Sequence, residues 1–290
     1  EKGADMIKAG IKKEFMLFSR GFRLIGVIIT IIGISLMYPL LYKSMEMMAG
    51  QIADMGQQIG GEAQDQLTDA VDSINGMMGS LATMYGGSMA AVGFKTGVSS
   101  ITSTGFLIIS LLLMSTAGGE QKKRSIIIPD CAGLTPAGYV MPKFIVYPVM
   151  IGLLSFLGGM TTGGISNLIY NNELNINDII FSSLCAAIYM LFMTALYFLI
   201  GLSTGRPGIS VIIVYGGSTI IPILLQSLDI DRYNPFTLQS LLMSSYNDAD
   251  MNNFMLSTVV AFILSVICCL LALMIMTLRR VDNTVGEANL

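Results

Sequence analysis

Residues 179–202 read IIFSSLCAAIYMLFMTALYFLIGL, a run of 24 residues without a charged side chain. About 20 consecutive apolar residues are enough for a helix to cross the hydrocarbon core of a bilayer. Lipid offers no hydrogen-bond partner to a free backbone amide, so a run of this kind must be helical. The stretch therefore predicts a membrane-spanning helix, and the rest of the chain can be read for others.

Five further runs have the same character. Together they predict six spans, at residues 24–43, 101–117, 144–160, 179–202, 209–226 and 255–278. No ionisable residue lies inside the apolar runs; Lys43 ends the first, and Asp178 flanks the fourth. Over all 290 residues, 53% are hydrophobic and 12% are charged, which is too few charges to cover a soluble domain. The predicted fold class is an all-α polytopic membrane protein.

Basic residues are concentrated in alternate connecting segments. If the N-terminus is placed in the cytoplasm, 13 of the 16 lysines and arginines lie inside and 12 of the 19 acidic residues lie outside. Short cytoplasmic segments of membrane proteins carry an excess of Lys and Arg. We therefore expect both termini, including a tail at 279–290, to be cytoplasmic.

The N-terminal segment 1–23 precedes the first span. Its apolar residues recur every three or four positions, for example at Ile11, Phe15, Phe18 and Phe22, and lysines occupy other faces. This pattern predicts a basic amphipathic helix in the inner membrane interface. A soluble helix packed on a partner is the alternative.

The segment 44–100 is the longest between two spans, and it contains six acids, one lysine and eight of the 22 methionines. Helical spacing on both sides of Gly60-Gly61 predicts an extracellular hairpin of two amphipathic helices. Methionine packs adaptably, so the hairpin is a candidate substrate surface. Its residues would be Met45, Met48, Met55, Met78 and Met84. An ordinary hairpin core and a copper(I) site are the other interpretations.

Two other segments lie between the spans. Residues 227–254 contain a turn ending at Pro235 and an apolar stretch too short to cross, which predicts an extracellular helix resting on the surface or re-entering it. Residues 118–143 read GGEQKKRSIIIPDCAGLTPAGYVMPK and are expected in the cytoplasm. An apolar cluster at 126–128 between charged anchors predicts a short helix held in a groove of a cytoplasmic partner. A plain topogenic loop is the alternative.

Several kinds of chemistry are missing from the sequence. There is no histidine, no phosphate-binding glycine loop and no nucleophile motif. We expect no enzyme activity, no cofactor or metal and no nucleic-acid partner for this chain. The four cysteines are expected to be reduced thiols: Cys131, Cys185, Cys268 and Cys269.

The order of these features resembles the type-two ABC exporter permeases, also called the type V fold. The resemblance covers nearly the whole chain. It is carried by Lys13-Glu14, the long first outer segment, Glu120, Leu134-Thr135-Pro136, Lys143, Asn234-Pro235, and Arg279-Arg280 followed by Asp282. Within the family, the chain looks most like permeases of small-peptide exporters of Gram-positive bacteria, such as those for phenol-soluble modulins.

This resemblance implies a transmembrane subunit of an ATP-driven exporter in a bacterial plasma membrane. ATP and magnesium would be bound by a separate cytoplasmic ABC ATPase, and the permease would pair with a second copy of itself or with a related chain. Coupling to the ATPase would use Glu120, Lys122, Lys123, Arg124, Leu134, Thr135, Pro136, Tyr139 and Lys143.

The substrate would be amphipathic or hydrophobic, most simply a small peptide, although drug, lipid-linked and ion exporters share the framework. Two other classes stay open. One is a non-transporting receptor or immunity protein that uses the hairpin to bind a ligand. The other is an ion-driven carrier, which the lack of ionisable residues in the apolar runs disfavours.

Overall fold

The part of the chain that the structure describes is built from helices and the turns between them. This computed structural model describes residues 2–59, 62–85, 87–120, 135–171, 173–227, 234–242 and 248–288. Among these residues, six helical stretches are long and apolar enough to cross a membrane. The all-α polytopic fold predicted from the apolar runs is therefore confirmed.

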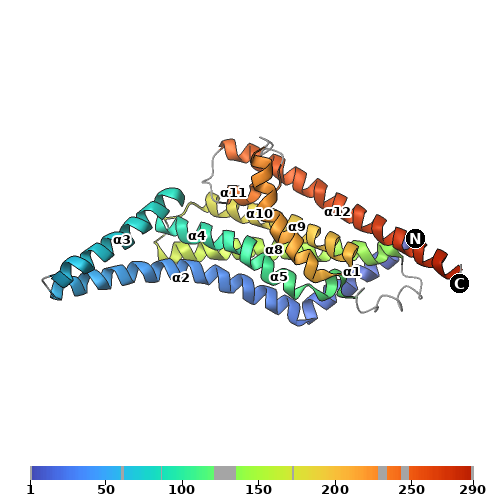
Figure 1. Ribbon diagram of the computed structural model, residues 1–290, viewed down its shortest axis with the longest axis horizontal. Coiled ribbons are helices and arrows are strands. Elements are labelled where there is room, and N and C mark those ends of the chain that lie inside the picture. Colours follow the sequence, from blue (N-terminus) through green and yellow to red (C-terminus); the bar gives the residue numbers. More distant parts are fainter. Residues whose placement is uncertain are drawn as a thin grey trace.

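The N-terminal half contains α1 (Lys2–Arg20), α2 (Phe22–Ile59), α3 (Glu62–Tyr85), α4 (Met89–Ser100), the π-helical turn η1 (Ile101–Gly105), α5 (Phe106–Leu112) and the turn η2 (Ser115–Gly119). The C-terminal half contains α8 (Pro136–Ile169), α9 (Ile176–Thr204), α10 (Pro207–Gln226), α11 (Thr237–Leu241) and α12 (Asp248–Ala288). The start of α1 and the end of α12 lie at one end of the elongated molecule, and the α2–α3 hairpin projects at the other (Figure 1). Six spans are an even number, so the two termini come to the same end.

Helix α9 is the centre of the bundle and the most buried of the six candidate spans. It packs against α8, α10, α11 and α12. On its side toward α8, the ring of Phe198 stacks on Tyr147 at 5.1 Å between centroids and meets Tyr197 edge-on at 5.8 Å. Large aromatic surfaces packed in this way fix the helices relative to one another.

The short helix α11 lies inside the bundle rather than on its surface. The amide of Phe236 donates to the side-chain oxygen of Asn234 at 2.9 Å, a turn that leads into the helix. The Phe236 ring then packs edge-on against Phe192, and the Tyr189 hydroxyl donates to Gln239 Oε1 at 3.0 Å. These contacts hold residues 236–242 against the middle of α9.

The second candidate span begins earlier than the sequence predicts. It runs from Met89 to Leu112, whereas the apolar run starts at Ile101. Residues 89–100 are mostly small or polar, so their mean hydropathy is low. They are nevertheless helical, and most of them are buried by neighbouring helices. Burial by protein rather than lipid is why an apolar-run criterion misses them.

The helix that carries the third apolar run starts before that run, because α8 begins at Pro136 and not at Phe144. The Thr135 hydroxyl caps the helix by accepting from the amide of Gly138 at 3.1 Å, and proline occupies the first turn. Residues 136–143, predicted as the end of a cytoplasmic segment, are thus helical and form the first two turns of α8.

Helix α2 is longer than a bilayer is thick. Its 38 residues extend for about 57 Å at 1.5 Å per residue, against a hydrocarbon core of about 30 Å. The stretch from Phe22 to Tyr42 alone covers about 31 Å. It is followed by Lys43, whose ammonium pairs with Glu46 at 3.0 Å. A single crossing therefore needs only part of α2, and α3 packs against the remainder (Figure 1).

The base of the hairpin is held against the end of α8. The Lys43 ammonium lies 5.3 Å from the centre of the Tyr170 ring, within the range of a cation–π contact. Burial, together with the carboxylates of Glu46 and Glu173, raises the pKa of the Tyr170 phenol to about 12. Tyr170 is therefore neutral at physiological pH.

Candidate functional site

A buried charged cluster lies where α1, the end of η2 and the start of α8 meet. Tyr139, Lys143 and Tyr147 are four residues apart on α8, a spacing that places them on one face of the helix. Lys143 is completely buried. Its ammonium donates to Glu14 Oε1 at 3.0 Å and pairs with Glu120 Oε2 at 3.1 Å.

The two tyrosines complete the cluster. The Tyr147 hydroxyl donates to Glu14 Oε2 at 3.0 Å, and the Tyr139 hydroxyl donates to Glu120 Oε2 at 3.0 Å. The Lys143 ammonium also lies 4.9 Å from the centre of the Tyr139 ring. Each carboxylate is therefore bound by both an ammonium and a phenol. A buried charge needs such partners, since an unpaired one in a low-dielectric environment is very unfavourable.

Helix α1 docks on α8 through residues spaced by four: Gly10, Glu14 and Phe18. A Cβ on Gly10 would lie 2.5 Å from Pro142 Cγ, so the two helices approach closely at that point. The ring of Phe18 is fully buried and meets Tyr147 edge-on at 5.6 Å. Glu14 lies between these two contacts and is thereby aimed at Lys143.

A small cleft between α1 and the first turn of α8 borders the cluster. Its volume is about 220 Å³. It is lined by Met6, Ala9, Gly10, Lys13, Glu14, Gly138 and Tyr139. The cleft combines apolar walls with a charged floor, so it can accept a side chain from outside the bundle.

The structure brings together three of the residues predicted to couple to an ATPase: Glu120, Tyr139 and Lys143. Thr135 and Pro136 form the N-terminal cap of α8 just beside them. The remaining four predicted residues, Lys122, Lys123, Arg124 and Leu134, lie outside the described residues.

Two members of the cluster were absent from the predicted site. The sequence analysis names Glu14 only within the family pattern. An acid among lysines on an amphipathic helix looks like a solvent-exposed residue. Tyr147 lies inside an apolar run and looks like a lipid or core residue. The useful signal is the four-residue spacing of Tyr139, Lys143 and Tyr147, which only becomes visible once the helix is known to start at Pro136.

The position of Lys95 differs from the one predicted from the sequence. The sequence places it in the extracellular segment, but it lies on α4 inside the second candidate span and is only 3% exposed. The carboxylate of Asp178, in the first turn of α9, interacts with it electrostatically. The apolar runs contain no ionisable residue, but the longer helices that carry them do.

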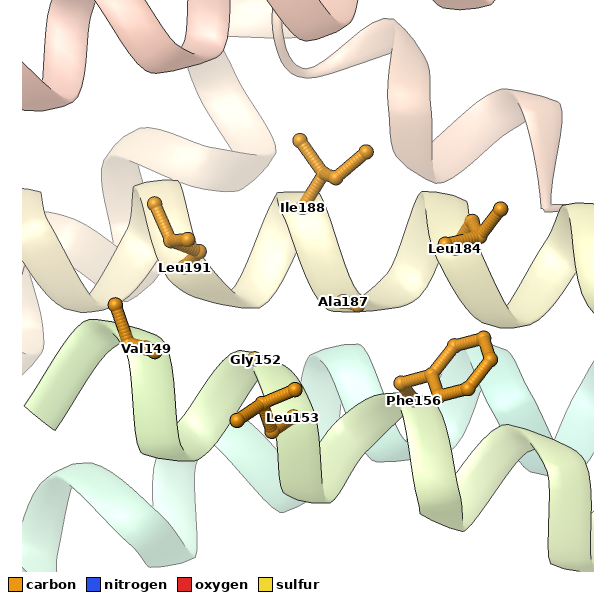
Figure 2. Close-up of a pocket in the computed structure, with 8 residues that line it drawn as sticks. All are labelled: Val149, Gly152, Leu153, Phe156, Leu184, Ala187, Ile188 and Leu191. Carbon is orange, nitrogen blue, oxygen red and sulfur yellow. The ribbon is translucent and has the colours of Figure 1, made fainter.

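An apolar groove runs between α8 and α9 on the outside of the bundle. Figure 2 shows the residues that line it, Val149, Gly152, Leu153 and Phe156 on α8 and Leu184, Ala187, Ile188 and Leu191 on the adjacent α9. The groove has a volume of about 320 Å³. Gly152 and Ala187 allow the helices to approach, since a Cβ on Gly152 would lie 3.1 Å from the Ala187 carbonyl oxygen.

The methionines of the predicted substrate surface do not all lie on the surface. Met48, Met55 and Met84 are exposed, and Met45 is half-buried. Met78 is only 7% exposed, so it does not belong to an exposed ligand surface. It is on the face of α3 that includes Ile74, and residues four apart on a helix share a face.

The three described cysteines, Cys185, Cys268 and Cys269, are free thiols. Cys131 lies outside the described residues.

Comparison with known proteins gives no relative: no family model, no curated protein and no solved structure matches this chain.

Proposed function

We propose that this chain is the transmembrane subunit of an ATP-driven exporter whose ATPase is a separate cytoplasmic protein. The observation that carries the proposal is the cluster around Lys143. Glu120 and Tyr139 lie near the two ends of the segment predicted to dock on the ATPase. The Tyr139 hydroxyl donates to Glu120, and Glu120 pairs with Lys143. A movement of that segment is therefore applied directly to the start of α8.

The same cluster extends the movement to α1 through Glu14. Coupling between two sites needs a connected element that moves as a unit between discrete arrangements. Separating buried ions leaves a charge uncompensated, which is strongly destabilising. The cluster thus favours joint motion of α1, η2 and α8 over local rearrangement. The adjoining cleft offers a place for an apolar side chain of the ATPase.

We place the cluster on the cytoplasmic side of a bacterial plasma membrane. Four basic residues of α1 support this orientation: Lys8, Lys12, Lys13 and Arg20. They lie at the same end as both termini, and the acidic hairpin lies at the opposite end (Figure 1). This distribution follows the excess of Lys and Arg on cytoplasmic segments.

The proposed substrate is amphipathic or hydrophobic, with a small peptide as the first candidate. The apolar groove between α8 and α9 supports this choice, because it offers no polar group to a sugar or an ion. Transport would use a pair of permeases, either two copies of this chain or this chain and a related one. MgATP would be bound by the ATPase.

The test is ATP hydrolysis by the complex, purified from native membranes after crosslinking and reconstituted in lipid discs. Glu120→Gln and Tyr139→Phe are expected to leave the ATPase bound while reducing peptide-stimulated hydrolysis about tenfold, equivalent to a loss of about 1.4 kcal/mol of coupling. Lys43→Met is the matched control, because it removes a lysine–glutamate pair of similar length, 3.0 Å, near the middle of α2 and outside the cluster.

Two results would contradict the proposal. One is the absence of an ATPase in stoichiometric amount from the crosslinked complex. The other is peptide translocation by the purified chain alone in discs without nucleotide.

The hairpin favours one alternative function, a membrane receptor or immunity protein. Its exposed methionines form a surface that a soluble ligand could reach without any transport. Such a protein would bind a ligand and show no nucleotide-dependent change, which the same ATPase assay distinguishes.

A further inference from the structure

The exposed large apolar side chains described in the outer hairpin are of one type. We define the hairpin as residues 43–85, which comprise α2 from Lys43 onward together with α3. Its branched residues, such as Leu67, Val71 and Ile74, are half-buried. Among the hairpin side chains that the structure describes, the exposed large apolar ones are all methionines: Met47, Met48, Met55, Met77 and Met84. Their exposed fractions range from 50% to 76%.

The spacing of the exposed methionines suits contact with a helical ligand. Met48 and Met55 are seven residues apart on α2, and Met77 and Met84 are seven apart on α3. Seven residues are two helical turns, about 10.5 Å, so each pair lies along one side of its helix. Amphipathic helices bind grooves and helices through anchors at this same spacing. Methionine is frequent on surfaces that accept varied apolar partners.

The hairpin is also strongly acidic. Six acids against one lysine give residues 43–85 a net charge of −5. Glu46, Asp54, Asp69 and Asp72 are exposed. The lysine, Lys43, is already paired with Glu46. The hairpin therefore presents apolar anchors together with a net negative charge.

Charge decides which partner fits. A second copy would bring another hairpin of the same negative charge against this one, and like charges at close range are unfavourable. The bilayer is also a poorer occupant, because the stretch from Phe22 to Tyr42 already covers about 31 Å, the thickness of the hydrocarbon core, before the first of these methionines. A cationic amphipathic helix fits both the exposed methionines and the negative charge. Its apolar face would lie on the methionines, and its lysines or arginines would lie beside the carboxylates.

We propose that the hairpin binds cationic amphipathic helical peptides on the outer side of the membrane. This surface is separate from the Lys143 cluster, and binding there needs neither ATP nor an ATPase. The inference therefore goes beyond the transport function and stands or falls independently of it.

The experiment measures binding of a fluorescein-labelled leucine–lysine peptide, long enough to form an amphipathic helix. The protein is embedded in phosphatidylcholine discs, and empty discs give the lipid background. We expect binding above that background, weakening as salt shortens the Debye length from about 10 Å to about 3 Å. A leucine–glutamate peptide of the same length and pattern should not bind.

Variants locate the surface. The combined changes Met48→Ser and Met55→Ser, and separately Met77→Ser and Met84→Ser, should each weaken binding about tenfold through lost apolar contact. The combined changes Asp54→Asn, Asp69→Asn and Asp72→Asn should weaken binding and flatten its salt dependence. All these side chains are exposed, so the thermal unfolding midpoint should stay unchanged.

Two controls match these variants at other places. Asp5→Asn removes an exposed acid on α1, and Met16→Ser removes an exposed methionine on the same helix. Both should bind the peptide like the unaltered protein. Binding no greater than that of empty discs, or unchanged binding in the hairpin variants, would overturn the proposal. So would efficient disulfide formation between two copies of Met55→Cys, which would identify a second copy as the occupant.

Discussion

Lys143 shows how a single residue can hold three elements together. Its ammonium is buried without access to solvent, and its pairs with Glu14 and Glu120 replace the lost hydration. The exposed pair of Lys43 and Glu46 has the same 3.0 Å separation, but its side chains are 35% and 45% exposed. Equal distances therefore have different consequences, because water screens one pair and not the other.

This contrast gives a prediction at the residue scale. Lys143→Met leaves Glu14 buried without its counter-charge and should lower the free energy of unfolding by about 3–5 kcal/mol. Lys43→Met should change it by less than about 1 kcal/mol, because the pair is exposed. Thermal unfolding of both variants in detergent measures the difference.

A further variant separates charge from packing. Glu14→Gln combined with Lys143→Met removes an acid together with the lysine, so it should recover part of the stability lost in Lys143→Met alone. If the single and double variants are equally unstable, packing rather than charge dominates at this position.

At the scale of the element, glycines decide how closely α8 approaches its neighbours. A Cβ on Gly159 would lie 2.5 Å from Ser183 Oγ, and one on Gly163 would lie 2.5 Å from Ile179 Cγ2, both on α9. The helices can therefore pack with their backbones close together, which is a common way for helices to associate in membranes. Gly118 has a different role, since its φ of +120° is one that side-chain-bearing residues rarely adopt.

Neighbouring glycines on α8 make this argument testable. Gly163→Ala forces a methyl group against Ile179, which is only 2% exposed and has no room to move, and should cost about 1–3 kcal/mol. Gly164→Ala meets nothing within 4 Å and should instead stabilise the helix by about 0.5–1 kcal/mol. The two thermal midpoints should therefore move in opposite directions. A shift of the same sign in both would show that α8 and α9 are not in close contact there.

At the scale of the whole molecule, charge and shape divide along the long axis. The basic α1 and the Lys143 cluster occupy the end that carries both termini, and the acidic hairpin extends from the other (Figure 1). A bilayer placed across the six spans therefore separates a basic end from an acidic one.

The orientation can be measured on intact cells. In a variant whose four native cysteines are replaced by alanine, Asp72→Cys should react with an impermeant maleimide added outside. Lys8→Cys should react only after the membrane is permeabilised, because we expect positive segments to stay in the cytoplasm. Labelling of Lys8→Cys in intact cells would reverse the proposed topology.

The amino-acid sequence by itself determined the class of this protein. Uncharged runs such as 179–202 must be helical in lipid, so the number of spans follows from composition alone. Glu120, Tyr139 and Lys143 were named from the sequence only as positions that the resemblance to exporter permeases implies.

Only the tertiary structure decided which charges meet. Glu14 is 129 residues from Lys143 along the chain, and no local pattern reports a contact over such a distance. The same holds for Lys95, which looks like a loop residue until α4 is seen packed inside the bundle. Hydropathy along a chain measures how a segment interacts with lipid, whereas burial by neighbouring helices depends on how distant segments pack.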